Sequence, residues 1–420
     1  MTNDTNRLTA SESGMATPHE GLRDELTELL DVVGPGKVGD VVLERAFELS
    51  ATDLHLEPTG DGLRIRMRVD GLLHEIARLP QSAASPMISR FKVLAGMDIT
   101  ERRFAQDGHI SLNTRHGKRD VRVGSGPTIH GERVVLRLMP DQEHFTQLDG
   151  LGFDNSELSA VRRCLAAPYG LILVVGPVGS GKSTSVYSFL QELNSPNKSI
   201  VTIEDPVERH LPGACQIQVE PKIGFNFADA LRCVLRQDPD IMMVGEIRDA
   251  ETAQIACRSA LTGVLVLSTL HANNTASAID VLHNFGVPRM VIADCLRGII
   301  SQRLVLKVCE EHREEYIPDE PVCQMLDVDP SNAGTVKLVR GIPADKNFRT
   351  GYSGRCGVYE VMEINKSLQR GILQGSSATE LMELAELNGM KTLARSIRDK
   401  VLARVTSMDQ FHATALSIGE

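Results

Sequence analysis

The chain has 420 residues, of which 42% are hydrophobic and 24% are charged, and its formal net charge is −10. This composition is sufficient for large cores, and the length predicts two or three domains. The acidic balance and the 4% content of aromatic residues argue against a protein that binds nucleic acid broadly. No apolar run approaches the ~18 residues of a membrane-spanning helix, so none is expected. No apolar segment follows the first residues, so no signal peptide is expected. The eight scattered cysteines indicate a reducing compartment.

The first part of the chain is expected to form an α+β domain. Residues 1–18 are rich in Ser, Thr, Asn and Gly, which predicts a disordered tail. Leucines at helical spacing predict a helix from Glu20 to Val33, and Gly34-Pro35-Gly36 should separate it from a second helix, Val38–Leu49. A further helix is expected at Ser85–Gly96, and strands are expected at Leu63–Val69, His109–Leu112, Arg119–Val123 and Arg133–Leu138. Arginines alternate with apolar residues in Leu63–Val69, so they either form a solvated face or point at a phosphate held elsewhere.

A glycine-rich stretch after the apolar run Leu171–Val175 fits the P-loop pattern G-x-x-x-x-G-K-[ST]. The stretch consists of Gly176, Pro177, Val178, Gly179, Ser180, Gly181, Lys182, Ser183 and Thr184. Its glycines let backbone N–H groups surround phosphate oxygens, and the helix that follows adds its positive dipole end. We therefore expect ATP to bind here, with Lys182 at the β- and γ-phosphates and Ser183 as a ligand of Mg²⁺.

Strands and helices alternate after this loop, which predicts a parallel α/β sheet with strands at 171–175, 200–203, 241–244 and 264–268. Polar motifs follow three of these strands, at the sheet edge where α/β proteins bind ligands. Glu204, Asp205 and Glu208 follow the second strand and are expected to act through Mg²⁺, water or an arginine; otherwise they cap the next helix.

The third strand ends in Val244-Gly245-Glu246, a Walker B arrangement in which Gly245 replaces the usual Asp. The missing Asp predicts that Ser183, the phosphates and water hold Mg²⁺, with Asp205 as a further candidate through water. Glu246 is expected to polarise the attacking water. His271 follows the fourth strand and either senses the γ-phosphate or is a structural histidine.

These motifs, in this order and preceded by Ala51–Pro58, resemble the ATPases of type II secretion and type IV pilus assembly, the general secretory pathway E family. The resemblance covers roughly residues 38–412 and includes Gly131–Arg137 and Gly389–Leu393. It implies an α/β fold in which a PAS-like α+β domain precedes a RecA-like P-loop ATPase domain, with a mostly helical C-terminal region. The expected boundaries are a tail at 1–18, a helix and linker at 19–36, the PAS-like domain at 37–140, a linker at 141–150, the ATPase core at 151–305, an irregular subdomain at 306–358 and a helical region at 359–420.

The resemblance also implies a motor that hydrolyses ATP as a homohexameric ring in the cytoplasm, peripherally associated with the inner membrane. It would power assembly of a pseudopilus or type IV pilus through platform and docking proteins of that membrane. By match to family positions, Arg122 and Arg137 would reach the phosphates from the N-terminal domain, and Arg232 and Arg236 from the ATPase domain. Together with Glu246, Glu204, Glu208 and His271, these arginines form the expected catalytic set.

The sequence departs from the family at several positions. Val178 stands where relatives have Thr, and Val264 stands where they have His. Many relatives carry two Cys-x-x-Cys pairs after the ATPase core; here Cys309 and His312 occupy the first, and the second has no cysteine. Two ligands cannot complete a tetrahedral zinc site, so we expect no zinc. Only a tail and two helices precede the PAS-like region, so a different docking surface or partner is expected.

Other functions remain open at this stage. A pilus retraction motor is the alternative within the same class, although the long segment from 309 to 352 favours assembly or secretion. A nucleic-acid translocase on the same RecA-like core is disfavoured by the acidic charge, and no nucleic-acid partner is expected. An ATP-binding scaffold without hydrolysis is disfavoured by the presence of Lys182, Ser183 and Glu246.

Overall fold

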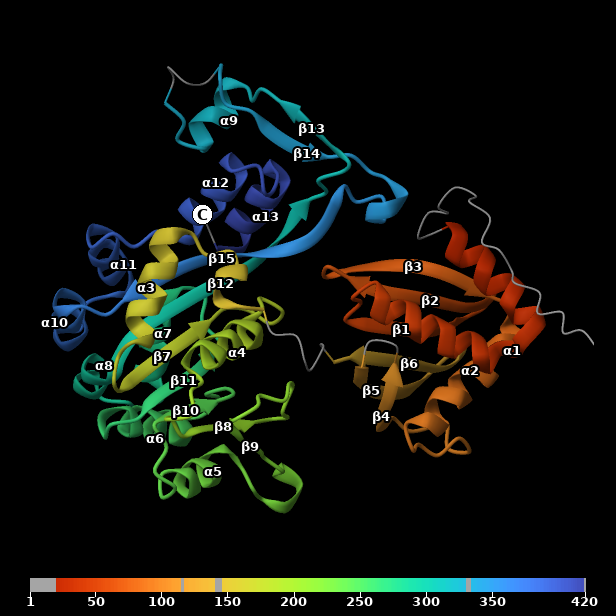
Figure 1. The fold of residues 1–420 in the computed structure, drawn as a ribbon, viewed down its shortest axis with the longest axis horizontal. Coiled ribbons are helices and arrows are strands. Elements are labelled where there is room, and N and C mark those ends of the chain that lie inside the picture. The colour runs from red at the N-terminus through yellow and green to blue at the C-terminus, as the bar shows by residue number, and fades with distance from the viewer. Residues whose placement is uncertain (1–19, 115–116, 140–145, 330–333, 419–420) are drawn as a thin grey trace, which may run out of the picture. The chain divides into compact units, whose positions relative to one another are not determined.

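The computed structural model describes residues 20–114, 117–139, 146–329 and 334–418, which form two compact units (Figure 1). The first unit contains the elements from α1 to β6, apart from the first residues of β5, and a later segment, Pro343–Thr350. The second unit contains the elements from α3 to the end of α13. The tail expected at 1–18 and residues 141–145 of the expected linker lie outside the described residues. Among the residues described, no helix is both long and apolar enough to cross a bilayer.

The first unit is a six-stranded sheet with helices on its apolar face (Figure 1). The strand order is β3-β2-β1-β6-β5-β4, and all strand pairs for which a register is given are antiparallel. The elements are α1 (Glu20–Glu48), β1 (Asp53–Thr59), β2 (Gly62–Val69), β3 (Leu72–Leu79), α2 (Gln81–Leu94), β4 (Gln106–Thr114), β5 (Gly117–Thr128) and β6 (Gly131–Leu138). Helix α1 is interrupted at Gly34, whose φ of 77° lies outside the helical region, so the break expected from Gly34-Pro35-Gly36 is confirmed.

The alternating pattern of β2 separates two faces of this sheet. Leu63, Ile65 and Met67 are buried and pack in the core with side chains of α1 and α2. Arg64 and Arg66 point to the other face and are only half-buried. The sheet therefore has one apolar and one basic face, as the sequence predicted.

The second unit contains a seven-stranded sheet of order β15-β12-β7-β11-β10-β8-β9. Neighbouring strands from β12 to β9 are parallel, and β15 pairs antiparallel with β12. The strands are β7 (Gly170–Val175), β8 (Ile200–Glu204), β9 (Cys215–Gln218), β10 (Ile241–Val244), β11 (Leu265–Leu270), β12 (Leu296–Val308) and β15 (Tyr352–Glu363). The strands expected in the ATPase core are confirmed to within a residue or two at their ends.

Helices cover both faces of this sheet because its central strands are apolar on both sides. Alternate residues of β7 enter different cores: Leu171 and Leu173 pack with one set of helices, and Ile172 and Val174 with the other. The helices on the Ile172 side are α3 (Asn155–Leu165) and α4 (Lys182–Leu193). Those on the Leu171 side include α5 (Phe227–Val234), α6 (Ala250–Leu261), α7 (Thr275–Asn284) and α8 (Arg289–Cys295).

The segment expected to be irregular contains a second, two-stranded sheet. Strands β13 (Arg313–Tyr316) and β14 (Leu338–Gly341) pair antiparallel, with α9 (Glu320–Met325) between them in the chain. The sequence also predicted helices from residue 359, but β15 continues to Glu363 and forms an edge of the main sheet. This pairing with β12 joins residues far apart in the chain, so local pattern did not reveal it.

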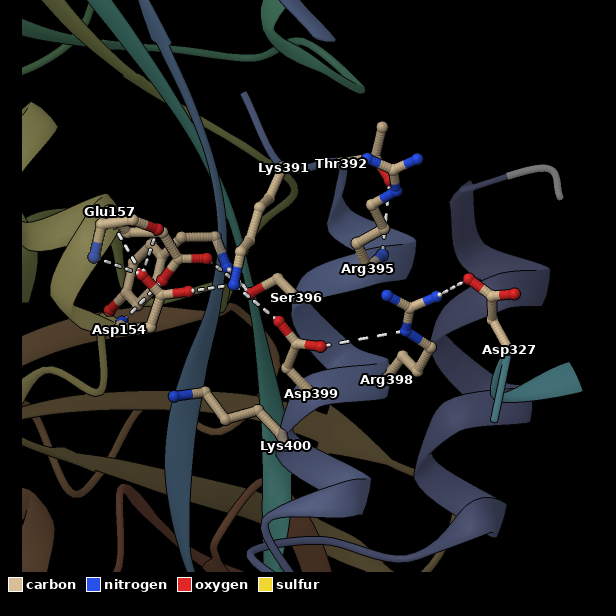
Figure 2. A network of polar contacts seen from close by, with 12 residues as sticks. Asp154, Glu157, Asp327, Lys391, Thr392, Arg395, Ser396, Arg398, Asp399 and Lys400 are labelled. Carbon is tan, nitrogen blue, oxygen red and sulfur yellow. Dashed lines mark hydrogen bonds and ion pairs between the residues drawn. The ribbon is translucent and has the colours of Figure 1, made fainter. Parts of the chain in front are cut away.

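Among the C-terminal helices, α12 is linked by a polar network to α3 near the start of the second unit (Figure 2). These helices are α10 (Lys366–Gln374), α11 (Ala378–Leu387), α12 (Leu393–Leu402) and α13 (Met408–Ile418). The Lys391 ammonium donates to Asp154 Oδ2 at 2.6 Å and to Asp399 Oδ2 at 2.7 Å. Asp154 is the N-cap of α3, and Glu157 on that helix accepts a hydrogen bond from Ser396 Oγ at 2.9 Å. Helix α12 and Lys391 just before it are thereby linked to α3.

Candidate active site

Four neighbouring strands bring the predicted motifs to one edge of the second unit's sheet. Strands β7, β11, β10 and β8 are adjacent and parallel, so their carboxyl ends lie side by side. The P-loop follows β7, His271 follows β11, Glu246 follows β10, and Glu204 is the last residue of β8. This is the edge at which open parallel sheets bind their ligands.

The P-loop packs so tightly on β12 that its first glycine cannot carry a side chain. Gly176 has φ of +147°, and a Cβ built there would lie 2.6 Å from Gln302 O and 2.8 Å from Ser180 Oγ. Gly181, with φ of 87°, is the N-cap residue from which α4 begins at Lys182. The loop thus leads into a helix whose first N–H groups have no intrahelical partner and are available to an anion.

Lys182 folds back onto the P-loop. Its ammonium donates to the carbonyl oxygens of Gly176 at 2.8 Å and Pro177 at 3.0 Å. Burial lowers the pKa of Lys182, the charge of Arg303 lowers it further, and Glu246 partly opposes both. A phosphate group could replace these carbonyls as the partner of the ammonium and restore the stability of its charged form.

Glu246 is the centre of a small charged cluster. Its Oε1 lies 2.8 Å from His271 Nε2, and its Oε2 accepts from Arg248 Nε at 2.7 Å. The carboxylate is 18% exposed and the imidazole 49% exposed, so both are open to solvent and to a ligand. The structure therefore brings together the candidate base and the candidate γ-phosphate sensor, which lie on different loops.

Glu204 is buried, and both oxygens of its carboxylate accept hydrogen bonds from neighbouring side chains. Tyr187 Oη donates to Glu204 Oε2 at 2.5 Å, and Thr202 Oγ1 and Gln216 Nε2 donate to Oε1 at 2.6 Å and 3.1 Å. Burial and then the charge of Glu204 raise the pKa of Tyr187, so the phenol stays protonated and remains a donor. This arrangement fixes the end of β8, a role that the acidic motif alone did not indicate.

The remaining acidic candidates lie on the loop after β8. Asp205 is exposed, and its Oδ2 lies 3.7 Å from Arg248 Nη1. The Nε of the same arginine contacts Glu246. Glu208 is half-buried, and its charge contributes to the raised pKa of Tyr187. Ser183 is exposed on the first turn of α4 and is free to meet a ligand there.

The predicted arginines differ in their surroundings. Arg232 pairs with Asp229 at 3.1 Å and also contacts Glu251, and Arg236 is an exposed residue just after α5. In the first unit Arg137 Nε lies 3.4 Å from Asp53, and Arg122 is exposed and opposite Arg137 in the register of β5 and β6. The roles of all these arginines at a phosphate stay predictions.

The basic face of the first unit is largely neutralised by its own carboxylates. Glu57 is 7% exposed, and its oxygens lie 2.9 Å, 2.7 Å and 3.1 Å from nitrogens of Arg64, Arg66 and Arg133. Burial opposes ionisation of Glu57, but the hydrogen bonds and charges of these arginines outweigh it and lower the pKa. Part of the basic face predicted from sequence is therefore an ion-paired sheet surface.

A cavity of about 300 Å³ opens beside the P-loop. It is lined by Gly176, Pro177, His271, Ala272, Asn273, Ser277 and Val281. A cavity of about 330 Å³ elsewhere in the unit is lined by side chains of α3, β15 and the segment before α12, and no P-loop residue contributes to it. The cavity at the P-loop is the candidate nucleotide site, because both the glycine loop and His271 line it.

The segment in which the resemblance implied metal-binding cysteines contains Cys309 and His312. Cys309 Sγ lies 3.8 Å from His312 Nδ1. In the described part of the chain, no three or more His, Cys, Asp and Glu side chains are grouped so that they could hold a metal ion. The absence of zinc stays a prediction from the missing ligands.

Sequence comparisons show which family the chain resembles over nearly its full length. The family described as "Type II/IV secretion system protein" matches residues 36–413. The chain is 39% identical over 387 residues to the type IV pilus assembly ATPase PilB of Thermus thermophilus, covering 92% of this chain and 44% of that protein. It is 40% identical over 392 residues to the type II secretion system protein E of Xanthomonas campestris, covering 93% of this chain and 68% of that protein.

Solved structures support the fold. The Legionella pneumophila ATPase DotB superposes with a TM-score of 0.67 at 23% identity, covering 90% of this chain and 95% of that chain. The pilus retraction motor PilT with bound ADP superposes with a TM-score of 0.61 at 25% identity, covering 89% and 95%. Together with the P-loop, Glu246 and His271 at one sheet edge, these matches show that the chain belongs to the type II/IV secretion system protein family, a family of nucleotide-binding secretion and pilus assembly ATPases.

Proposed function

We propose that this chain is an ATP-hydrolysing motor that powers assembly of a type IV pilus or of the pseudopilus of type II secretion. The observation that carries this proposal is the contact of 2.8 Å between Glu246 and His271 at the sheet edge that also carries the P-loop. The relatives at about 40% identity are named for pilus assembly and type II secretion, which favours assembly over retraction. The chain spans only 44% of the first of these relatives, so cargo and partners are part of the proposal.

The site suits ATP with Mg²⁺. Ser180 Oγ is buried in the P-loop without a hydrogen-bond partner among the described residues, and Gly176 leaves no room for a Cβ, as expected of a loop that cradles phosphate. Ser183, and Asp205 through water, would hold Mg²⁺, which supplies charge neutralisation at the phosphates when bound. Lys182 would exchange its carbonyl partners for phosphate oxygens.

Glu246 is the residue to which we assign the hydrolytic step. Its carboxylate would orient and polarise a water for in-line attack on the γ-phosphate, and His271, in contact with it, would sense that phosphate. Glu204 at the end of β8 and Glu208 on the loop after it would support the site. Arg122, Arg137, Arg232 and Arg236 would stabilise the charge that develops in the transition state.

We further propose that the chain works as a homohexameric ring on the cytoplasmic face of the inner membrane, coupled to platform and docking proteins there. Rotation between its two units would supply the stroke. The alternative within this class, a retraction motor, is supported by the likeness to PilT at 25% identity and is the weaker one.

The experiment that tests the proposal measures ATPase rate against protein concentration, with molar mass determined by light scattering, for wild type and Glu246→Gln. We expect the rate per subunit to rise as the mass approaches that of six subunits, and we expect the Gln variant to bind ATP without turnover. A wild-type protein that binds ATP but never hydrolyses it in any assembled state would show that the chain is a nucleotide-binding scaffold.

A further inference from the structure

Two adjacent buried residues on β12 join the P-loop to the loop that carries His271. We propose that Gln302 and Arg303 are positioning residues. They hold the P-loop and the His271 loop in a fixed relation, so that nucleotide binding at the P-loop affects the position of His271. The inference rests on the ATPase function proposed above and adds to it a role that the motifs do not assign. Gln302 is 1% exposed and Arg303 is 7% exposed, so neither acts as a surface residue.

The register of the sheet explains why these residues meet the P-loop. Strand β12 runs parallel to β7, with Ser301 opposite Val175, the last residue before the loop. The next residues of β12 therefore continue along the strand at the level where β7 turns away into the loop. Gln302 and Arg303 occupy this position.

Gln302 fixes the P-loop by hydrogen bonds at both ends of its amide. Its Nε2 donates to Ser180 O at 2.5 Å, and its Oε1 accepts from Ser185 Oγ on α4 at 2.8 Å. Its backbone carbonyl oxygen is the atom that a Cβ on Gly176 would strike, at 2.6 Å. Gln302 thus contacts the loop near its beginning, its middle and the helix that follows.

Arg303 continues the connection toward His271. Its Nη2 donates to Asn273 O at 2.8 Å and its Nη1 donates to Gln302 O at 3.0 Å. The Nη1 nitrogen also lies 3.4 Å from the position that a Cβ on Gly176 would take, so the guanidinium sits beside the first P-loop glycine. Asn273 follows His271 closely in the chain, so a hydrogen bond to its carbonyl group restrains the loop that carries His271.

The far end of the same loop is held by β15. Glu360, 2% exposed, accepts from Thr275 N at 2.9 Å and from Thr275 Oγ1 at 2.7 Å, at the start of α7. The loop from His271 to Thr275 is therefore held by Arg303 near its middle and by Glu360 at its end. A shift of the P-loop against β12 would be transmitted through Arg303 to the position of His271, and through His271 to Glu246.

The charge of Arg303 indicates what it faces. Among the described residues no carboxylate oxygen lies within the 4.0 Å of an ion pair with it, and its Nε is buried without a hydrogen-bond partner. A buried guanidinium that bonds only to carbonyl oxygens is costly unless an anion compensates it. Burial lowers the pKa of Arg303, and the charge of Glu360 only partly opposes this. The triphosphate in the neighbouring P-loop is the anion that would balance it.

The chain offers a matched control for Arg303 on the same strand. Arg297 also donates to carbonyl oxygens, those of Tyr169 at 3.1 Å and Asp294 at 2.8 Å, but at the other end of β12. We expect Arg303→Met to lower kcat about 10-fold, because it misplaces His271 and misplacement of catalytic groups by an ångström costs up to ~10²-fold. The KM for ATP should rise less than kcat falls, by about 3-fold, because the triphosphate loses the charge of Arg303 but keeps the P-loop and Lys182. Arg297→Met should leave both constants near wild type, and Arg303→Lys, which keeps charge but not the two-pronged contact, should fall between.

A double variant tests whether Arg303 acts through the His271 loop. If it does, Arg303→Met combined with His271→Ala should lower kcat about as much as the more damaging single substitution, because both remove the same effect. Losses that multiply, or an Arg303→Met variant that behaves like Arg297→Met, would overturn the proposal. If the Met variant does not fold by circular dichroism, the Lys variant decides: a wild-type kcat in that variant overturns the proposal in the same way.

Hydrogen exchange separates this inference from the ATPase proposal because it needs no turnover. ATP added to the Glu246→Gln protein should slow amide exchange at residues 271–275, and adding Arg303→Met should abolish that slowing while ATP still binds. If wild type never hydrolyses ATP but this transmission is present, the function proposed above fails and the positioning role stands. If wild type hydrolyses ATP and exchange at 271–275 is equally slowed in both proteins, the positioning role is wrong.

Discussion

Nε2 of His271 lies 2.8 Å from Oε1 of Glu246, although the two residues follow different strands of the sheet. The contact depends on the adjacency of β10 and β11, in which Val244 pairs with Ser268. It places the imidazole on the carboxylate that is proposed to act on water. The histidine can therefore orient that carboxylate without itself being the base.

For His271→Asn we expect kcat to fall about 10-fold, less than the ~10²-fold or greater loss expected for Glu246→Gln, because the base remains but is less well oriented. Phosphate release under saturating ATP measures both. His283→Asn is the control, since His283 lies on α7 and the one hydrogen bond of its ring among the described residues is with Val287 O, at 3.4 Å. A larger loss for His271→Asn than for Glu246→Gln would contradict this ranking.

Tyr187→Phe should destabilise the second unit by about 1–2 kcal/mol, because it removes a donor from a buried carboxylate that keeps only part of its hydrogen bonds. The lost contact is the 2.5 Å hydrogen bond to Glu204. Denaturant unfolding monitored by circular dichroism measures the change. Tyr169→Phe is the control, because that ring is 41% exposed. An unchanged unfolding midpoint for Tyr187→Phe would show that the hydrogen bond adds nothing to stability.

The Asp154 carboxylate should make stability depend on acid pH. Burial disfavours its charge, but hydrogen bonds from Lys391 and Ser156 prevail and lower its pKa from 3.8 to about 2. Its contribution is therefore complete above about pH 4 and is lost as the pH falls toward 2. Because the group is partly exposed, we expect a loss on the order of 1 kcal/mol.

The measurement for Asp154 is the free energy of unfolding between pH 5 and pH 2.5 for wild type and Asp154→Asn, which keeps a good N-cap. The advantage of wild type should shrink across that range. Asp327→Asn is the control, since Asp327 pairs with Arg398 on α12 at 2.9 Å but is 85% exposed. A constant difference between wild type and Asp154→Asn would show that the carboxylate gains nothing from Lys391.

Gly176→Ala should weaken ATP binding by at least about 10-fold, since the added methyl group must displace the P-loop from β12 and strains a backbone that favours glycine. The clash is with Gln302 O at 2.6 Å. Titration with a fluorescent ATP analogue measures the change. Gly126→Ala is the control, because nothing lies within 4 Å of a Cβ there. Wild-type affinity in Gly176→Ala would mean that the loop tolerates the displacement.

The sequence was sufficient for the strands of the ATPase core and for the motifs at their ends. Each of these features is local. An apolar run such as Leu171–Val175 indicates by its composition that the strand is buried, and the glycine pattern after it indicates the backbone conformation of the loop. Their convergence on one edge then follows from the parallel topology. Glu246 and His271 could be paired in this way before any distance was known.

Partners that pair across the chain could not be predicted. Nothing near Glu204 in the sequence indicates that Tyr187 would cover it, and nothing near Arg303 indicates that its guanidinium would reach Asn273. The helical region was expected to begin at 359, where β15 instead continues, because the pairing of β15 with β12 is a long-range property. The signal for Gln302 and Arg303 was weak but present: with Ser301 they form three polar residues that directly follow the buried isoleucines 299 and 300.

Strand β15 and Lys391 complete structures that begin far earlier in the chain, and this has a consequence for protein synthesis. A ribosome releases the P-loop and Glu246 long before it releases Glu360, which holds Thr275, or Lys391, which holds Asp154. A nascent chain can therefore contain every motif of an ATPase while the loop of His271 lacks its second attachment. A message cut short before Glu360 would therefore yield a chain that carries the P-loop and Glu246 but lacks the hydrogen bonds that hold Thr275.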